Sequence, residues 1–381
     1  MGAAILAHAR RTSPRCLNAP KQLQIPTVQR ENVVLGYLWR NFVAERVADQ
    51  CRLEAARLEA QIAAAIEALR TEIRETAKLS NANAQATAEQ LERLRQAAST
   101  LFLPVHGILP PSDGPYMAYS TCSAGDMKNR QYVDFCEAAG VAKVFHRKHW
   151  EWAFITHHLQ RLGAIGPGRR GIVFGVGTEA LPSFFASKGA QIVATDAPPE
   201  IGEAKGWAAT NQFIDSVEGL WRECNNIDRA TFMQRVSYET CDMTAIPAHL
   251  IGFDFCWSSC CFEHLGSLQA GLDFVVNSVE KTLLPGGIAV HTTEFNLSSN
   301  DETVGDGPTV LYRKRDLEDV IRTLRDRGHE VDDLRVAPDI DPLDFYVDAP
   351  PYHTEPHLKL RLMGYTSTSV GLVIRRGPIA T

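Results

Sequence analysis

Residues 171–196 constrain the fold of this chain more than any other segment. Their sequence, GIVFGVGTEALPSFFASKGAQIVATD, is an apolar run, a glycine turn, a helix-like segment and a second apolar run that ends at Asp196. Two apolar runs separated by a helical segment indicate two buried parallel strands and the helix that connects them. The segment therefore predicts the first βαβ unit of a parallel sheet of the nucleotide-binding type.

The turn after the first apolar run has the properties of a ligand-binding loop. Gly175 and Gly177 let the backbone turn sharply and approach a ligand closely, and the next helix offers its unpaired N–H groups. Asp196 is positioned to accept hydrogen bonds from a ribose diol. The segment from Gly175 to Ala180 also fits the pattern G-x-G-x-x-G/A, so the turn alone does not separate NAD from S-adenosylmethionine.

The composition restricts partners and location. The 381 residues are 45% hydrophobic and carry a net charge of −6, which gives no reason to expect a nucleic-acid partner, since such proteins normally present a basic face. The nine cysteines include no C-x-x-C pair, which favours reduced thiols and a cytoplasmic location. No apolar stretch approaches the roughly 18–20 residues of a transmembrane helix, so we expect a soluble protein.

The first third of the chain predicts an extension outside the globular part. Residues 1–30 contain five basic residues and no acid, and predict a basic disordered tail. Residues 31–103 are rich in Ala, Glu, Arg, Leu and Gln and predict a long helix. Residues 104–116 contain several prolines, which indicate a linker before a domain at 117–381.

The long helical segment carries a heptad pattern. One heptad position holds Ile62, Leu69 and Ala97, and a second holds Ile66, Ile73, Leu94 and Leu101. This pattern predicts a coiled coil and a homo-oligomer joined through the N-terminal helices. Polar residues fill the middle of the same register, namely Thr76, Ser80, Asn83, Thr87 and Gln90. They leave open an alternative in which the segment forms one amphipathic hairpin folded onto the globular domain.

The remaining sequence alternates between strand-like and helical segments. Strand-like runs cover residues 191–195, 236–241, 253–257, 288–292, 330–336 and 369–374, with helical segments at 268–283 and 314–327. A further helix, with Trp150 and Phe154 on its apolar face, precedes the first strand and begins with the basic cluster His146–His149. Either this cluster faces an anionic ligand or it is a solvated helix entry. The alternation predicts an α/β fold, a Rossmann-like doubly wound, mostly parallel sheet, with the N-terminal helical extension.

Polar groups follow the third and fourth strand-like runs. Asp242 and Met243 suit an adenine amine beside an apolar wall, although the aspartate could equally cap the next turn. Ser258 stands where the chain leaves the sheet and is a further candidate for cofactor binding. The segment EHLG, residues 263–266, is expected to begin a helix, and LLPGG, residues 283–287, to form a helix end and a tight turn before the fifth strand.

The glycine turn, the two aspartates, EHLG and LLPGG occur in an order that resembles class I S-adenosylmethionine-dependent methyltransferases, over roughly residues 145–376. The resemblance implies S-adenosylmethionine as cofactor, with Gly175 and Gly177 under its methionine portion, Asp196 at its ribose hydroxyls, and Asp242 with Met243 at its adenine. These families usually place an acid two residues before the first glycine and a third glycine later. This chain has Val173 and Glu179 there, so Glu179 or Glu294 could hold the cofactor's amino group.

The sequences of the segments HRKHWEWAFI, WSSCCFEHLG and HTTEFN also resemble those of a bacterial subgroup of these methyltransferases, which is associated with cell-surface glycan or glycolipid assembly. This resemblance implies a glycan or small-molecule acceptor. The methyltransferase domain at 117–381 would then have a cofactor-binding core at about 145–300 and an acceptor-side insertion at about 338–366.

The residues that follow strands four and five are the candidates for acid–base chemistry. His264, and His291 together with Glu294, are expected to face the acceptor, and a histidine with a pKa near about 6.5 could take a proton from a sugar hydroxyl. His291 is the first choice as base. For each histidine the alternative is a hydrogen bond in the core.

The insertion at 338–366 supplies candidate acceptor-binding residues. Tyr346, Tyr352 and His353 offer rings that stack on sugars and polar groups that bind hydroxyls. No spacing among the nearby His, Asp and Glu residues matches a zinc pattern, so no metal is expected.

The expected function is transfer of a methyl group to a sugar hydroxyl. One alternative is an NAD-dependent sugar oxidoreductase or epimerase, whose short-chain form relies on a Tyr-x-x-x-Lys pair that this sequence lacks. Another is a non-catalytic coiled-coil scaffold with a decayed methyltransferase domain, which Val173 and Glu179 would explain.

Overall fold

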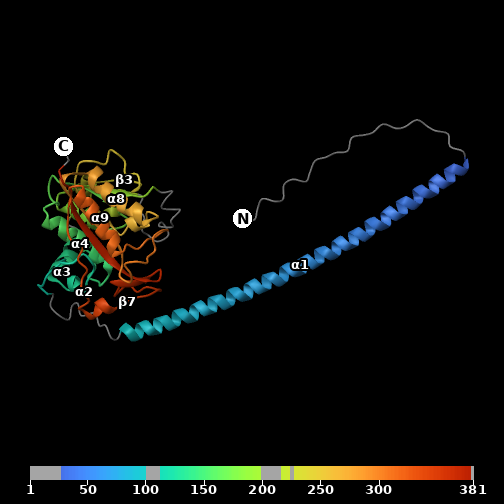
Figure 1. The fold of residues 1–381 in the computed structure, drawn as a ribbon, viewed down its shortest axis with the longest axis horizontal. Coiled ribbons are helices and arrows are strands. Elements are labelled where there is room, and N and C mark those ends of the chain that lie inside the picture. The colour runs from blue at the N-terminus through green and yellow to red at the C-terminus, as the bar shows by residue number, and fades with distance from the viewer. Residues whose placement is uncertain (1–26, 100–111, 199–215, 224–226, 379–381) are drawn as a thin grey trace. The chain divides into compact units, whose positions relative to one another are not determined.

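The computed structural model describes residues 27–99, 112–198, 216–223 and 227–378 (Figure 1). The chain divides into two units, Met1–Glu92 and Arg93–Thr381, which are described separately. Most of the predicted basic tail falls on residues 1–26, and most of the predicted linker on residues 100–111, which lie outside the described residues. No helix in the described ranges is both long enough and apolar enough to cross a bilayer.

The first unit contains the helix α1, Thr27–Ser99, which is continuous over 73 residues. The predicted long helix is confirmed, and it begins four residues inside the stretch predicted as a tail. The hairpin alternative is wrong, because the chain does not reverse within the helix. The absence of proline and the high content of Ala, Leu, Glu and Arg explain its length. The structure holds a single copy of α1, so the coiled coil stays a prediction.

The second unit is built on a nine-stranded sheet with the order β3-β2-β1-β4-β5-β9-β8-β7, and with β6 paired to β9. The strands are β1 Arg170–Phe174, β2 Gln191–Asp196, β3 Val236–Thr240, β4 Phe253–Ser259, β5 Leu283–Asn296, β6 Glu330–Val331, β7 Val347–Asp348, β8 Lys359–Leu362 and β9 Tyr365–Arg375. The strands β1 to β5 are parallel, and β9 runs antiparallel to its neighbours. The predicted α/β, mostly parallel sheet is confirmed.

Helices cover both faces of this sheet. They are α2 Ala124–Met127, α3 Arg130–Ala139, α4 Arg147–Arg161, α5 Leu181–Ser187, α7 Arg229–Arg235, α8 Leu268–Asn277 and α9 Lys314–Asp326. Along β1, Val173 packs into one apolar cluster with residues of α4 and α5, whereas Ile172 and Phe174 pack into another with residues of α8 and α9. This alternation is the period-two pattern of a strand that is buried on both sides.

Some predicted boundaries are wrong for local reasons. The segment predicted as one helix over 268–283 is α-helical only as far as Asn277, and a π-helical turn follows at Ser278–Thr282. The strand predicted over 330–336 is paired only at Glu330–Val331. The EHLG segment begins with a short 3-10 turn, Phe262–His264, rather than a helix.

The LLPGG segment is part of β5 and not a turn before it. Phe253 pairs with Leu283 and Phe255 pairs with Ile288, so the residues between them bulge out of the ladder. Gly286 lies in this bulge with φ of 80°, a left-handed conformation that favours glycine.

Candidate functional site

A cavity of about 670 Å³ lies at the carboxyl ends of β1 to β5, where the strand order reverses between β1 and β4. This is the edge at which doubly wound sheets bind ligands, and the volume suits a small-molecule site. Two groups of lining residues differ in how they are held. We call Gly175, Gly177, Glu179, Asp196, Asp242 and Met243 the turn side, and Arg147, Lys148, Cys260, Glu263, His264 and Glu294 the network side.

The glycine turn of the turn side requires glycine at both positions. Gly175 and Gly177 have φ of 65° and 49°, in the left-handed region. A Cβ atom on Gly175 would lie 2.8 Å from Cβ of Cys261. The backbone N–H of Gly177 donates a hydrogen bond of 2.9 Å to Oδ2 of Asp196. The turn after β1 is therefore tied directly to the end of β2.

Asp196 is buried and lines the cavity. Its Oδ1 accepts a hydrogen bond of 2.8 Å from the N–H of Ala197, while Oδ2 accepts the bond from Gly177. These bonds fix the carboxylate, and each carboxylate oxygen can accept more than one hydrogen bond. A diol in the cavity would thus meet a carboxylate that is already oriented.

Asp242 and Met243 form the adjoining wall. Oδ1 of Asp242 accepts hydrogen bonds from the N–H and the hydroxyl of Thr244, at 2.8 and 2.7 Å. This is the capping arrangement that the sequence left open, and it coexists with a place in the cavity wall. Met243 is buried and supplies apolar surface beside the carboxylate.

Glu179 is a buried carboxyl in the cavity wall. Its Oε1 accepts a hydrogen bond of 2.6 Å from the indole N–H of Trp257. Burial raises the pKa of Glu179 to about 8, although this hydrogen bond acts in the opposite direction. At pH 7 the group is therefore mostly neutral, and a cation placed beside it would favour its ionisation.

The network side is organised around Glu151, which has 0% of its surface exposed. Its Oε2 accepts hydrogen bonds from Nζ of Lys148 at 3.1 Å and from the hydroxyl of Ser259 at 3.0 Å, and Arg147 lies 3.4 Å from its Oε1. Burial alone would raise the pKa of Glu151, but Lys148 and Arg147 outweigh it and lower the pKa to about 2. A permanently charged carboxylate thus positions both cations at the cavity.

Glu294 lines the cavity in the place that the sequence predicts for it. It forms an ion pair with Arg147, and its Oε2 accepts a hydrogen bond of 2.6 Å from the hydroxyl of Ser367. The basic cluster at the start of α4 therefore does face the cavity through Arg147 and Lys148. Its two histidines do not line the cavity: His146 stacks on His357.

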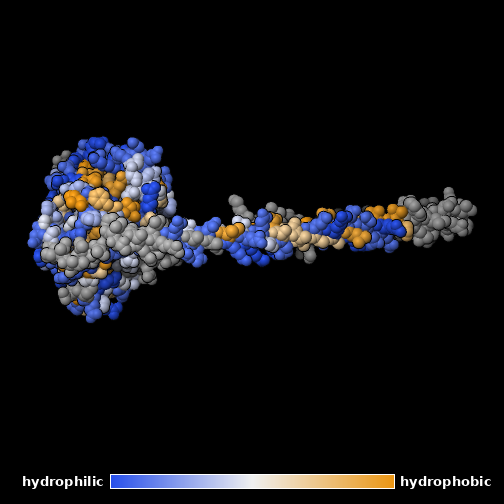
Figure 2. Space-filling model, turned by 90° about the horizontal axis from the view of Figure 1, so that it is seen from below, coloured by the Kyte–Doolittle hydropathy of each residue, from blue (hydrophilic) through white to orange (hydrophobic). Residues whose placement is uncertain are grey.

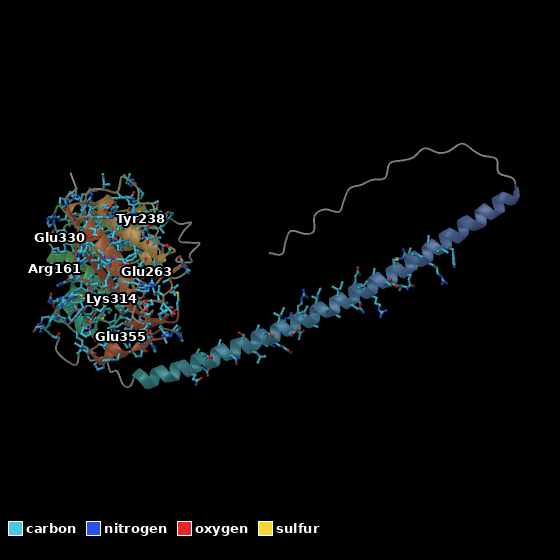
Figure 3. The ribbon with its side chains drawn as sticks, viewed as in Figure 1. Arg161, Tyr238, Glu263, Lys314, Glu330 and Glu355 are labelled. Atoms are coloured by element: carbon cyan, nitrogen blue, oxygen red, sulfur yellow. The ribbon has the colours of Figure 1, made fainter. Side chains whose placement is uncertain are left out.

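Glu263, which is labelled in Figure 3, is followed by His264, and both belong to the 3-10 turn after β4. Burial raises the pKa of Glu263, and its Oε2 accepts a hydrogen bond of 3.0 Å from the hydroxyl of Thr293. Nδ1 of His264 lies 2.9 Å from the carbonyl oxygen of Pro308. Because a carbonyl oxygen only accepts, Nδ1 carries the proton, and the basic lone pair of the neutral ring is on Nε2.

His291 does not face the acceptor space, so the prediction for this residue is wrong. The ring is 0% exposed, with Nδ1 2.8 Å from the hydroxyl of Ser258 and Nε2 2.9 Å from the hydroxyl of Ser278. Burial lowers its pKa to about 3. His291 and Glu294 are an odd number of residues apart on β5, so their side chains point to opposite faces of the sheet.

Ser258 is misplaced for the same reason. It is fully buried and bonded to His291, while the next residue, Ser259, lines the cavity. The predicted strand ended at residue 257, whereas β4 continues to Ser259, so the pleat places Ser258 in the core and Ser259 at the cavity.

The predicted acceptor-binding residues of the insertion lie elsewhere. The hydroxyl of Tyr346 is 3.3 Å from Nδ1 of His353, and the hydroxyl of Tyr352 donates to the carbonyl of Arg361 at 2.8 Å. Neither these three residues nor any other described residue at 338–361 lines the cavity, to which Leu362 contributes. Asp341, Asp344 and Glu355 of the insertion bond to Lys128 and to the N–H groups of Ala124 and Phe145, so the polar groups of the insertion are used in packing and not in a pocket.

Cys260, Glu263 and Glu294 bring one possible ligand atom each to within 4.8 Å of one another. However, the Cys260 thiol donates a hydrogen bond of 3.0 Å to Oε1 of Glu151, and burial raises its pKa well above the ordinary value. Arg147 already pairs with Glu294. A protonated thiol beside a fixed guanidinium is a poor cation site, so the group is better suited to hydrogen bonding.

Sequence reasoning missed Glu151, Cys260 and Glu263 as parts of the site. Glu151 had a local signal, since it lies three and four residues after Lys148 and Arg147, the spacing of ion pairs on one helix face. Cys260 and Glu263 are more than one hundred residues away from Glu151 along the chain. Their contacts with it depend on the folded sheet.

The sequence matches no protein-family model and no curated protein. Parts of the structure resemble a proposed sarcosine dimethylglycine methyltransferase from Galdieria sulphuraria (16% identity, TM-score 0.28), covering 47% of this chain and 51% of that one. They also resemble phosphoethanolamine N-methyltransferase 2 from Haemonchus contortus (17% identity, TM-score 0.31), covering 53% of this chain and 46% of that one. A third similarity is to magnesium protoporphyrin IX methyltransferase from Synechocystis (13% identity, TM-score 0.35), covering 60% and 83%.

This chain spans about half the length of the first two of these proteins. At such identities and TM-scores the similarities support no inference about function. The chemistry of the cavity has to be argued from its own residues.

Proposed function

We propose that this chain is an S-adenosylmethionine-dependent methyltransferase whose turn side binds the cofactor and whose network side binds the acceptor. The observation that carries the proposal is the joint position of the glycine turn, Asp196 and Asp242 at the ends of three successive strands around one cavity. The glycine turn suits the methionine portion of the cofactor, Asp196 its ribose and Asp242 its adenine. The three groups follow one another across the sheet in the same order as these three parts do in the molecule.

The residues of the turn side fit the proposed cofactor. The backbone at Gly175 and Gly177 has no side chain to obstruct its methionine portion, and Asp196 is oriented for its ribose hydroxyls. Asp242 with Met243 would hold adenine. Glu179 is the candidate for the ammonium group, because a buried carboxyl with a raised pKa gains most from a cation.

When bound, the cofactor would supply a methyl group on a sulfonium sulfur, whose carbon an acceptor oxygen can attack in line as the carbon–sulfur bond breaks and its electron pair stays on the thioether. The protein has to hold the acceptor in that line and receive the proton of its hydroxyl. Nε2 of His264 is the proposed proton acceptor, since Nδ1 is engaged with Pro308. The proton leaves the hydroxyl for Nε2 as the new carbon–oxygen bond forms, and His264 takes the role that His291 cannot fill.

The proposed acceptor is a sugar hydroxyl of a glycan or glycolipid intermediate. In its support, Arg147, Lys148 and Glu294 present fixed donors and acceptors for hydroxyl groups, and Trp152 adds an aromatic surface to the cavity wall. The buried free thiols Cys122, Cys136 and Cys256 are compatible with a reducing compartment, and we propose the cytoplasm.

Transfer of a tritiated methyl group from the cofactor tests this function. Full-length protein is incubated with nucleotide sugars and glycolipids in one series and with amines in another. We expect label in a sugar as an alkali-stable ether. Label in amines alone would contradict transfer to oxygen, while absence of transfer together with absence of cofactor binding would contradict the methyltransferase itself.

A further inference from the structure

One face of α1 carries a continuous line of small and apolar side chains, which we call the seam. Its first half consists of Ala44, Ala48, Cys51 and Ala55. Its second half consists of Leu58, Ile62, Ile66, Leu69 and Ile73, each at least 44% exposed. Successive members are three or four residues apart, so they share one side of the helix.

The seam is set apart from the rest of the helix surface. The opposite side carries exposed charged residues such as Arg46, Glu67 and Lys78, and Figure 2 shows apolar residues interspersed with hydrophilic ones along α1. An exposed apolar stripe of this length is unusual for a monomer and marks an interaction surface. A helix with such a stripe is stabilised mainly by packing it against a partner.

The seam continues beyond Ile73 with polar residues at the same spacing, namely Thr76, Ser80, Asn83 and Thr87. The face therefore has three blocks in order: small, large and polar. A partner helix has to match this order. The hydroxyls of Thr76 and Thr87 donate to carbonyls of their own helix, at Glu72 and Asn83. The most selective residue of the polar block is therefore Asn83, because a side-chain amide enclosed against methyl groups loses its hydrogen bonds.

We propose that the seam pairs with the seam of a second copy of this chain, in parallel and in register. In that arrangement each block meets its own kind. The side-chain amide of Asn83, which contains both donors and an acceptor, meets an identical amide, and a polar pair of this type at a core position selects register in coiled coils.

The antiparallel arrangement is unfavourable because of the polar block. If the two large blocks are aligned with opposite directions, the polar block faces the small block, which brings Thr87, Asn83, Ser80 and Thr76 against Ala44, Ala48, Cys51 and Ala55 in turn. The side-chain amide of Asn83 would then be enclosed against the methyl group of Ala48, with no polar group to bond to across the contact. This inference concerns α1 alone and does not depend on the chemistry of the cavity.

Disulfide cross-linking at Cys51 tests whether the two helices are parallel or antiparallel. It is an exposed free thiol within the seam. In the parallel arrangement the Cys51 thiols of two copies face each other, whereas in the antiparallel one they are about 44 Å apart at a rise of about 1.5 Å per residue. Diamide joins only thiols that meet: two thiols lose two protons and two electrons to form the disulfide, and diamide is reduced to its hydrazine.

The experiment uses the full-length chain. We expect light scattering to give a mass at least twice the 42.1 kDa of one chain, and diamide to yield a covalent dimer that Cys51→Ser abolishes. A mass of 42.1 kDa at micromolar concentration would overturn the self-association. An oligomer whose cross-linking does not depend on Cys51 would overturn the parallel register.

A matched pair of variants locates the contact. Ile66→Asp places a charge in the seam, and Leu53→Asp places the same charge at an exposed leucine outside it. We expect Ile66→Asp to reduce the mass to that of one chain at concentrations where wild type and Leu53→Asp remain assembled. Equal behaviour of the two variants would overturn the seam as the interface, and thermal unfolding followed by circular dichroism reports that the globular unit of each variant is folded.

Discussion

The two sides of the cavity are held in different ways. On the turn side, the backbone N–H of Gly177 donates to the side-chain carboxylate of Asp196, and both residues lie within one βαβ unit. On the network side, Glu151 of α4 contacts Cys260 after β4 and Ser369 of β9, which are 109 and 218 residues away. Binding groups on the turn side are thus fixed within one short segment, whereas the proposed acceptor groups also depend on contacts between segments that are far apart in the sequence.

Replacement of Glu151 is expected to have the largest effect on this comparison. Glu151→Ala removes the buried carboxylate that Arg147 and Lys148 share, and Arg147 keeps a second acidic partner in Glu294. Since breaking a buried ion pair commonly costs about 3–5 kcal/mol, we expect a loss of that size in the free energy of unfolding. Urea denaturation followed by circular dichroism measures it.

The control is an exposed ion pair in the same unit. Asp319 lies 2.9 Å from Arg322, and both side chains are at least 60% exposed. Asp319→Ala should cost less than about 1 kcal/mol. Similar losses for Glu151→Ala and Asp319→Ala would show that the network side is not held by Glu151.

We expect replacement of His264 to affect turnover and replacement of His291 to affect stability. His264→Ala should lower turnover by roughly 10²–10⁴ with little change in stability, because its ring lines the cavity. His291→Ala should instead lower the free energy of unfolding by about 2–4 kcal/mol, since it leaves a void and removes the partner of the buried Ser258 hydroxyl, while the Ser278 hydroxyl keeps its bond to the Val275 carbonyl. Turnover per folded molecule should stay near that of wild type.

Steady-state kinetics and denaturation of the same preparations distinguish these outcomes. A His291→Ala enzyme that is stable but inactive would restore His291 as the base. It would also mean that the pleat of β5 differs from the one described here.

Glu179, on the turn side, is expected to make a smaller contribution to stability, and this contribution depends on pH. Its pKa in the folded chain is about 8, above its ordinary value of 4.5. Between these values the unfolded chain releases the proton that the folded chain keeps, so stability decreases as the pH rises through this window. Glu179→Gln should remove this part of the slope in thermal denaturation between pH 5 and pH 8.

We also expect the carboxyl group of Glu179 to release a proton when the cofactor binds. If an ammonium group settles beside Glu179, the carboxyl ionises, and titration calorimetry at pH 7 in two buffers with different ionisation enthalpies detects the proton. Glu179→Gln should bind without this release. An identical release from the variant would place the ammonium group elsewhere.

The sequence predicts the turn side better than the network side for a physical reason. The glycine turn and Asp196 belong to one short segment whose pattern fixes both the strand ends and the turn. Glu151 and Cys260 meet only when α4 covers β4, β5 and β9, and no spacing in the sequence encodes that contact.

Pleat and local bonding explain the remaining misses. His291 lies on the expected strand but points to the other face, and Ser258 lies within β4, which is two residues longer than predicted; in both cases a shift of one residue would reverse the side chain. Tyr346, Tyr352 and His353 carry suitable groups, but these groups bond within the insertion. Composition and spacing identify candidate residues, and only the fold selects among them.

Titration calorimetry of the full-length chain with S-adenosylhomocysteine tests the central claim most directly. NAD⁺ serves as the competing ligand, and Asp273→Ala, an exposed aspartate on α8, is the control for Asp196→Ala. We predict micromolar binding of S-adenosylhomocysteine that weakens by roughly 100-fold in Asp196→Ala, as expected for lost charged hydrogen bonds, and that Asp273→Ala leaves unchanged. Binding of NAD⁺ alone, or of neither ligand, would contradict the account.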